Sequence, residues 1–280
     1  MNTLHERLTR TTFSLPLGEV HALLGGAVNA RPLLFLHGFP DHPPTAVPFL
    51  EHLAETHRVV APWLRGYAPS PIGGPYDLDT LAADALALID RLRPGRPRRL
   101  RLGGMITYTV CAAAPSHVRR AVTLAIPHPA TFLASSKQCK KSWYMAVFQL
   151  PGADYLVRRR ELALIDRLWR AWSPSFTLDS ARRDELHACL ERSLPAPLEY
   201  YRAIVRPLTT FVDRMRKAGA HIATPLLQLH GSDDGCIVPP TDEDRRLFGS
   251  RVLEVVPNLG HFLHVEAPAT IAARVARWLA

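Results

Sequence analysis

Cysteine is scarce in this chain of 280 residues, and the four cysteines lie far apart. None belongs to a Cys-x-x-Cys pair, so the sequence predicts neither a disulfide framework nor a zinc site, and we expect reduced thiols. A glycine-rich phosphate loop is also missing, and the histidines lack the spacing of metal ligands. We therefore expect no metal and no organic cofactor.

Long apolar runs are missing as well. No stretch of about 18 apolar residues occurs, which argues against a membrane span and a membrane partner. The first residues, MNTLHERLTRTTF, lack the apolar centre of a secretory signal peptide. The sequence thus predicts a cytoplasmic protein.

Acidic residues are the minority among the charges, 25 against 34 basic residues, which gives a net charge of +9. Such an excess can indicate a nucleic-acid partner. However, the densest basic run, at 91–101, contains no aromatic residues on which bases could stack. We expect no nucleic-acid partner, and the sequence leaves the oligomeric state open.

The composition that is present, 47% hydrophobic and 21% charged, suits a well-packed core. Up to about residue 128, apolar strand patterns alternate with helical periodicity, which favours a mostly parallel sheet flanked by helices. The expected strands are 11–15, 19–26, 31–39, 57–63, 98–102 and 118–126, and the expected helices are 47–55, 77–92 and an alanine-rich segment after residue 104.

The pattern changes between 129 and 220, where it becomes helical and rich in arginine, leucine and aromatic residues. Alternation then resumes, with strands expected at 224–231 and 251–256 and helices at 239–248 and 269–280. We predict an α/β core in two parts, 1–128 and 221–280, and an inserted helical cap at 129–220. Such a cap would cover the carboxyl edge of the sheet, where open α/β sheets bind ligands.

Five motifs occur in a characteristic order: LHGFPD, VVAPWLRGYAPSP, VTLAIPHP, LHGSDDGCI and NLGHFLHVEAP. With them the chain resembles the α/β-hydrolase family, most closely its epoxide hydrolase and haloalkane dehalogenase-like branch. The resemblance runs nearly from end to end. It implies the α/β-hydrolase fold and a hydrolase acting on an apolar small molecule, of the epoxide or ester type.

His261 and Asp234 are the candidate catalytic pair. His261 follows a strand and a glycine, and an imidazole with a pKa near neutrality is the natural proton carrier. The resemblance places the partner carboxylate three residues after Gly231, at Asp234, where it would orient the imidazole. The alternatives are a hydrogen-bonded loop histidine and a helix-capping acid.

The resemblance also implies hydrogen-bond donors for the substrate. The backbone N–H of Phe39, after His37 and Gly38, corresponds to an oxyanion-hole donor, and His37 is a candidate substrate contact. Relatives donate hydrogen bonds to an epoxide oxygen from tyrosines of the cap. The candidates here are Tyr144, Tyr155, Tyr200 and Tyr201, each with ordinary cap packing as the alternative.

The attacking residue is the main departure from the family. The branch usually reads Gly-His-Asp-Trp-Gly at the strand-to-helix turn, whereas this chain reads Gly-Gly-Met-Ile-Thr at 103–107. Met105 then occupies the nucleophile position, and a thioether cannot attack. An alignment from the other side instead leaves the turn about four residues short. Thr107, Cys111 and Ser116 are the weakly placed substitutes.

Two classes of function follow from this departure. One is an enzyme that uses His261 and Asp234 as a general base beside an oxyanion site, as a hydrolase, lyase or cyclase without a covalent nucleophile. The other is a catalytically inactive protein that binds a ligand on the hydrolase fold. A third explanation is an engineered or mistaken deletion at the turn.

Overall fold

The computed structural model of the chain describes residues 7–16, 18–92, 105–132 and 136–280. The strand expected at 98–102 lies outside these residues. So do Gly103 and Gly104 of the turn before Met105.

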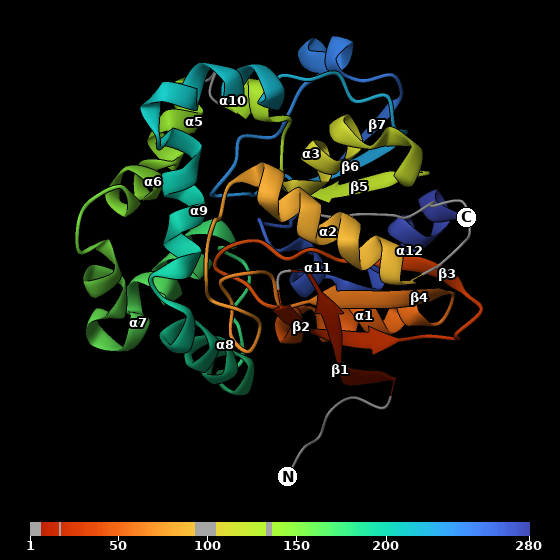
Figure 1. Cartoon of the computed structure of the whole chain (residues 1–280), viewed down its shortest axis with the longest axis horizontal. Coiled ribbons are helices and arrows are strands. Elements are labelled where there is room, and N and C mark those ends of the chain that lie inside the picture. Colours follow the sequence, from red (N-terminus) through yellow and green to blue (C-terminus); the bar gives the residue numbers. More distant parts are fainter. Residues whose placement is uncertain (1–6, 17, 93–104, 133–135) are drawn as a thin grey trace.

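The first half of the chain contributes a sheet with the strand order β1-β2-β4-β3 (Figure 1). β1 (Leu8–Leu15) and β2 (Gly18–Gly25) form an antiparallel pair, and β2 is also antiparallel to β4 (His57–Pro62). β3 (Arg31–Leu34) runs parallel to β4. The parallel strands are short apolar runs, as expected for strands covered on both faces.

The second sheet among the described residues joins segments that are far apart in the chain. β5 (Ala121–Leu124), β6 (Leu226–Gly231) and β7 (Arg251–Val256) pair in that order, all parallel. Every residue of β6 is buried, so this strand is central to the core. Its carboxyl end leads directly into the loop that contains Asp234.

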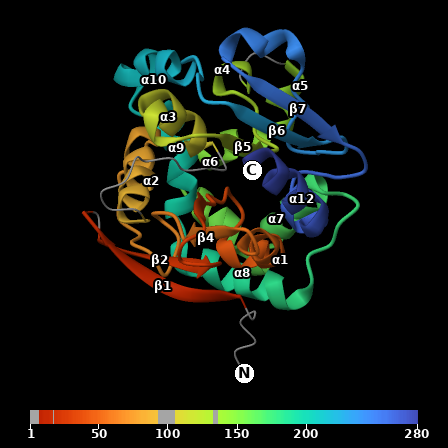
Figure 2. The same ribbon diagram turned by 90° about the vertical axis from the view of Figure 1, so that its right-hand side faces the viewer.

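Helices cover both faces of these sheets, as the alternation predicted. α2 (Leu78–Leu92) and α3 (Ile106–Ala113) pack together on one side, and α1 (Val47–Ala54) and α12 (Pro268–Leu279) pack together on the other (Figure 2). Asp77 caps α2 by accepting a hydrogen bond from the Thr80 N–H at 3.0 Å. The shorter helices of the core are η1 (Pro43–Ala46), η2 (Pro115–His117) and α11 (Leu263–Glu266).

Between β5 and β6, the described residues form helices and turns that lie to one side of the core (Figure 1). α7 is interrupted at Arg159–Leu162, where the backbone angles are not helical. We call this segment the cap. Its helices are α4 (Pro129–Phe132), α5 (Ser136–Lys141), α6 (Trp143–Phe148), α7 (Ala153–Trp172), α8 (Ser180–Ser193), α9 (Ala196–Val205), η3 (Leu208–Thr210) and α10 (Phe211–Ala218).

The prediction of a helix at 239–248 is wrong in both the length and the type of the helix. The structure has only a 3₁₀ segment, η4 (Asp242–Leu247), which Thr241 caps. Pro239 and Pro240 have no N–H to donate, and Phe248 is already extended, so no room remains for a regular α-helix.

Within the described ranges, no helix is both long enough and apolar enough to cross a membrane.

Candidate active site

The loop after β6 holds Asp234 in a network that uses both carboxylate oxygens. Oδ1 accepts hydrogen bonds from the backbone N–H groups of Cys236 at 2.7 Å and Ile237 at 2.8 Å. Oδ2 lies 2.9 Å from Nδ1 of His261. The carboxylate is buried, so its orientation is fixed by these contacts. The structure thus brings together the two residues that the sequence singled out as a pair.

The charge on Asp234 is stabilised despite its burial. Burial alone raises the pKa of this carboxyl, but the imidazole of His261, followed by that of His230, outweighs the effect and holds the pKa well below its usual range. His230 lies at the end of β6, with its Nε2 3.2 Å from the same Oδ2. An ionised carboxylate at this point orients the His261 ring with Nδ1–H as the donor.

His261 is held from its backbone as well as from its ring. Its N–H donates to the carbonyl oxygen of Trp172 at 3.0 Å, and its ring meets the Trp172 ring edge-on, with centroids 5.2 Å apart. None of the described residues hydrogen-bonds to the second ring nitrogen, Nε2. His261 lines a cavity, so this nitrogen is available to a ligand.

We call this space, which the candidate catalytic residue His261 lines, the catalytic cavity. It has a volume of about 180 Å³ and lies between the core and the cap. Most of its lining is aliphatic or aromatic, the character typical of small-molecule sites. The lining includes Phe39, Met105, Tyr144, Trp172, Tyr201 and Cys236.

Met105 lies immediately before the first residue of α3 and lines the catalytic cavity. The proposed substitutes for a nucleophile do not line it. Thr107 and Cys111 are buried within α3, and burial raises the pKa of the Cys111 thiol to about 12. Ser116 is exposed in η2, where its hydroxyl lies 3.3 Å from Nδ1 of His117.

The loop after β3 contributes Phe39 and His37. The Phe39 ring packs edge-on against Tyr201, with centroids 5.6 Å apart. The backbone N–H of Phe39 has no acceptor among the described residues. His37 accepts a hydrogen bond from the Leu64 N–H at 3.2 Å. Burial lowers the pKa of His37 to about 4, so its ring is neutral and braces the loop.

Two of the four candidate tyrosines face the catalytic cavity with hydroxyls not bonded to the backbone. Tyr144 and Tyr201 line it and contact each other edge-on, with ring centroids 5.8 Å apart. The Tyr144 oxygen lies 3.5 Å from the sulfur of Cys236. Burial raises the pKa of both phenols, so both remain protonated. Tyr200 also lines the cavity, but its hydroxyl donates to the backbone oxygen of Arg65.

The expectation for Tyr155 is wrong. Its side chain is 68% exposed on α7 and does not line the catalytic cavity. The buried positions of this turn are Ala153 and Val157, four residues apart on one face of the helix. Tyr155 lies between them in sequence and therefore points to the opposite, solvent face.

A second His–Asp pair lines the catalytic cavity, and the sequence did not indicate it. Oδ2 of Asp41 lies 3.0 Å from Nε2 of His264, and Oδ1 accepts from the His42 N–H and the Thr45 hydroxyl. Asp41 and His264 both lie in motifs that carry the family resemblance, and this was the one sequence feature that could have indicated the pair.

Within the described ranges, no three histidine, cysteine or acidic side chains cluster as metal ligands would.

The carbonyl oxygen of Trp172 is another feature that the sequence could not reveal. It accepts from the N–H of His261 at 3.0 Å and from the N–H of Gly235 at 3.1 Å. The end of α7 thereby joins the two loops that hold the His–Asp pair. Because the acceptor is a backbone atom, no residue type marks it in the sequence.

Comparisons with known proteins agree with this architecture. The family model described as alpha/beta hydrolase fold matches residues 31–268. Epoxide hydrolase 1 of Caenorhabditis elegans is 23% identical over 93% of this chain and 68% of its own. Epoxide hydrolase 4 of Homo sapiens is 25% identical, over 89% of this chain and 72% of its own.

A solved structure, reported as one of the novel epoxide hydrolases of the alpha/beta hydrolases superfamily in metagenomes from hot environments, superposes with a TM-score of 0.80. It is 26% identical, and the match covers 97% of this chain and 98% of that chain. The matches confirm the predicted fold class and the similarity to epoxide hydrolases.

Proposed function

The chain belongs to the alpha/beta hydrolase fold family, and on this premise we propose that it hydrolyses apolar epoxides without a covalent intermediate. The names of its relatives support the substrate class. The lining of the catalytic cavity supports an apolar small molecule. The observation that carries the proposal is the 2.9 Å contact between His261 and Asp234, which leaves Nε2 of His261 for the cavity.

The proposed reaction uses water as the nucleophile. Nε2 of His261 accepts a proton from water, and the resulting hydroxide attacks an epoxide carbon, whose bond to the ring oxygen breaks. The hydroxyl of Tyr144 or Tyr201 donates its proton to that oxygen, so a diol forms. The proton held by His261 then returns to the phenolate through solvent. Asp234 stabilises the imidazolium while it exists.

The residues around the cavity favour water over a protein nucleophile. Among the described lining residues, Asp41 is the one carboxylate, and its two oxygens are already engaged by His264, Thr45 and the His42 N–H. Burial raises the pKa of the Cys236 thiol, which therefore stays protonated and unreactive. Met105 has no proton to lose. The free N–H of Phe39 offers a further donor for developing negative charge.

The first prediction concerns His261. Replacing it with glutamine, which cannot serve as the base, should lower kcat for a simple aryl epoxide by about 10²- to 10⁴-fold, the usual contribution of a general base. Diol formation measured by chromatography checks this. The control is Tyr155→Phe, at the exposed surface of the cap, which should retain full activity.

A single turnover in ¹⁸O-water separates the proposed mechanism from a covalent one. If water attacks directly, the first diol released carries the heavy isotope. Unlabelled diol in the first turnover, with the label later found in the protein, would instead reveal an attacking carboxylate and overturn the proposal.

Ligand binding without turnover is the second candidate function. The position of Met105 in the catalytic cavity, before α3, favours it because the family's attacking group belongs at that turn. Binding of the epoxide without diol formation, by wild-type and His261→Gln protein alike, would establish this alternative.

A further inference from the structure

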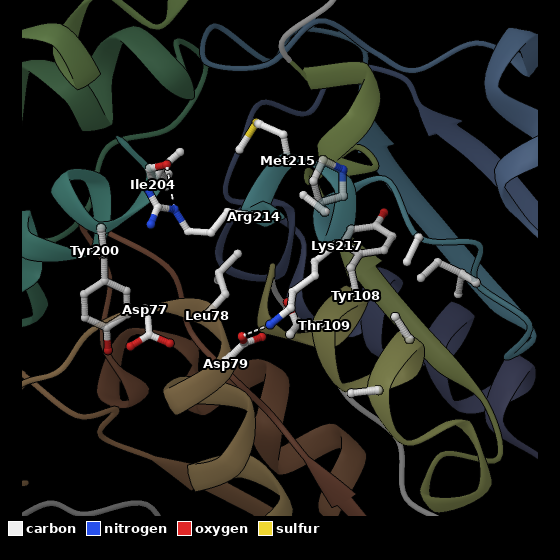
Figure 3. Close-up of a pocket in the computed structure, with 17 residues that line it drawn as sticks. Asp77, Leu78, Asp79, Tyr108, Thr109, Tyr200, Ile204, Arg214, Met215 and Lys217 are labelled. Carbon is white, nitrogen blue, oxygen red and sulfur yellow. Dashed lines mark hydrogen bonds and ion pairs between the residues drawn. The ribbon is translucent and has the colours of Figure 1, made fainter. Parts of the chain in front are cut away.

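A second cavity, lined by the side chains drawn in Figure 3, has a volume of about 360 Å³ and shares lining residues with the catalytic cavity. We call it the side chamber. Most of its walls come from α3, α9, α10 and the first turn of α2, and Pro129 of α4 and the segment after α10 complete the lining. Its small and apolar lining residues include Leu78, Ala112, Ala203, Ile204, Met215 and Ala218.

The side chamber and the catalytic cavity meet at three residues. Leu78, Tyr200 and Ile204 line both spaces. The Tyr200 ring stacks on Tyr76, with centroids 5.8 Å apart, and its hydroxyl is bonded to the backbone, so this ring is fixed. The aliphatic side chains of Leu78 and Ile204 are the parts of the partition that can change rotamer.

The acidic residues of the side chamber already have partners within the protein. Asp79 pairs with Lys217 at 2.5 Å, joining α2 to α10 (Figure 3). Asp77 accepts from the N–H of Thr80. These carboxylates therefore need no charged ligand.

The other charged and phenolic groups of the chamber are also bonded. Arg214 donates to the backbone oxygens of Val205 at 2.9 Å and Pro207 at 2.8 Å. The Tyr108 hydroxyl donates to the backbone oxygen of Ile126 at 3.0 Å. A ligand that fits this chamber is apolar, because an added polar group would find these partners occupied.

The size of the catalytic cavity indicates that a long substrate would extend beyond it. Its volume of about 180 Å³ is below the range of roughly 300–1,000 Å³ that is usual for small-molecule sites, whereas the two spaces together fall within that range. A substrate longer than the catalytic cavity needs additional space, and the side chamber adjoins that cavity.

We propose that the side chamber binds the aliphatic tail of an elongated substrate whose epoxide lies beside His261. This inference rests on the proposed function and names its substrate class: epoxides with a long hydrocarbon chain, which passes between Leu78 and Ile204. Each methylene group that leaves water for an apolar cavity strengthens binding by up to about fourfold. The chamber therefore selects for chain length.

The test uses two substitutions that fill the side chamber from two different helices: Ala218→Trp on α10 and Ala112→Phe on α3. Neither residue lines the catalytic cavity. The matched control is Val212→Trp on α10, where the native side chain is 77% exposed and does not line the chamber. Binding of hexanediol and dodecanediol, product analogues that require no catalysis, is measured by calorimetry. Hydrolysis of epoxybutane and epoxydodecane is measured separately.

We expect wild-type protein to bind dodecanediol at least about tenfold more tightly than hexanediol. Both chamber variants should remove most of this preference and change hexanediol binding by less than about twofold. The control variant should change neither the preference for dodecanediol nor the binding of hexanediol. Unchanged hexanediol binding also shows that the variants fold.

The two proposals fail in different ways. If wild-type protein prefers no chain length, or if both chamber variants keep the preference, the side chamber does not bind the tail, even where epoxybutane is hydrolysed. If the preference for the longer diol depends on the chamber but neither epoxide is hydrolysed, the binding role of the side chamber is supported and the proposed hydrolysis is wrong.

Discussion

Asp234 shows how individual residues in the site acquire their chemistry from buried neighbours. Two backbone N–H groups hold one oxygen, His261 contacts the other, and Nε2 of His230 lies 3.2 Å from that second oxygen. The family spacing identified Asp234 and His261 from the sequence. His230 could not be identified in this way, because a histidine within an apolar strand pattern carries no mark of the carboxylate it faces.

At the same scale, His37 predicts how stability depends on pH. Its pKa falls to about 4 in the folded protein because of burial, against about 6.5 for an unfolded histidine. The unfolded state therefore takes up the proton first as pH falls. The contribution of His37 to the free energy of unfolding is therefore complete above about pH 6.5 and is lost as pH falls towards 4. Between pH 7 and pH 5 this loss is about 2 kcal/mol.

Urea unfolding of wild-type and His37→Gln protein at these two pH values measures the effect. The variant should lose less stability than the wild type on acidification. His52→Gln, at an exposed position on α1, serves as the control and should follow the wild type. Equal losses in all three proteins would show that His37 is not the group responsible.

At the scale of elements, the end of α7 and the two loops that hold the His–Asp pair approach each other so closely that glycine is required. A Cβ atom at Gly260 would lie 2.5 Å from Cα of Ser173 and 2.7 Å from the Trp172 oxygen. The Ser173 hydroxyl also accepts from the Phe262 N–H at 3.1 Å and donates to Glu266 at 2.6 Å. The junction therefore sets both the position of the cap and the orientation of His261.

Gly260→Ala should consequently reduce both stability and activity. The added methyl group must displace backbone atoms, so we expect a loss of about 1–3 kcal/mol in the free energy of unfolding and a lower kcat as His261 moves. Thermal unfolding and epoxide hydrolysis check the two effects. Gly73→Ala, where a Cβ atom would meet nothing within 4 Å, is the matched control. Wild-type behaviour of both variants would contradict the close junction.

At the scale of the whole molecule, cap and core share one packed interface. Trp169 of α7 stacks on Phe262 of the core, with ring centroids 3.6 Å apart, and its Nε1–H donates to the Pro40 oxygen at 3.1 Å. These contacts connect the cap to both the loop after β3 and the loop that follows His261. Cap and core should therefore unfold together.

Trp169→Ala should weaken this coupling. Removing a buried tryptophan typically costs about 3–5 kcal/mol, and here the lost contacts are those between cap and core. Circular dichroism and tryptophan fluorescence should report a single shared transition in the wild type and a strongly destabilised protein in the variant. Trp143→Ala, at a side chain that is 43% exposed, should cost much less. Equal losses in the two variants would argue against a specific role of the interface.

The sequence by itself determined the alternation of strands and helices, the helical character of the cap and the identity of the His–Asp pair. These follow from local periodicity, from caps such as Asp77 and from motifs of fixed spacing. The helix predicted at 239–248 was longer than η4, because the two prolines at its start cannot donate backbone hydrogen bonds.

Only the tertiary structure decided which side chains share a space. It turned Tyr155 to solvent, fixed the hydroxyl of Tyr200 on the backbone, made the Trp172 carbonyl a common acceptor and formed the side chamber from helices far apart in the chain. These features depend on contacts between segments far apart in the chain. Local sequence periodicity reports which face of an element is buried, but not what lies against that face.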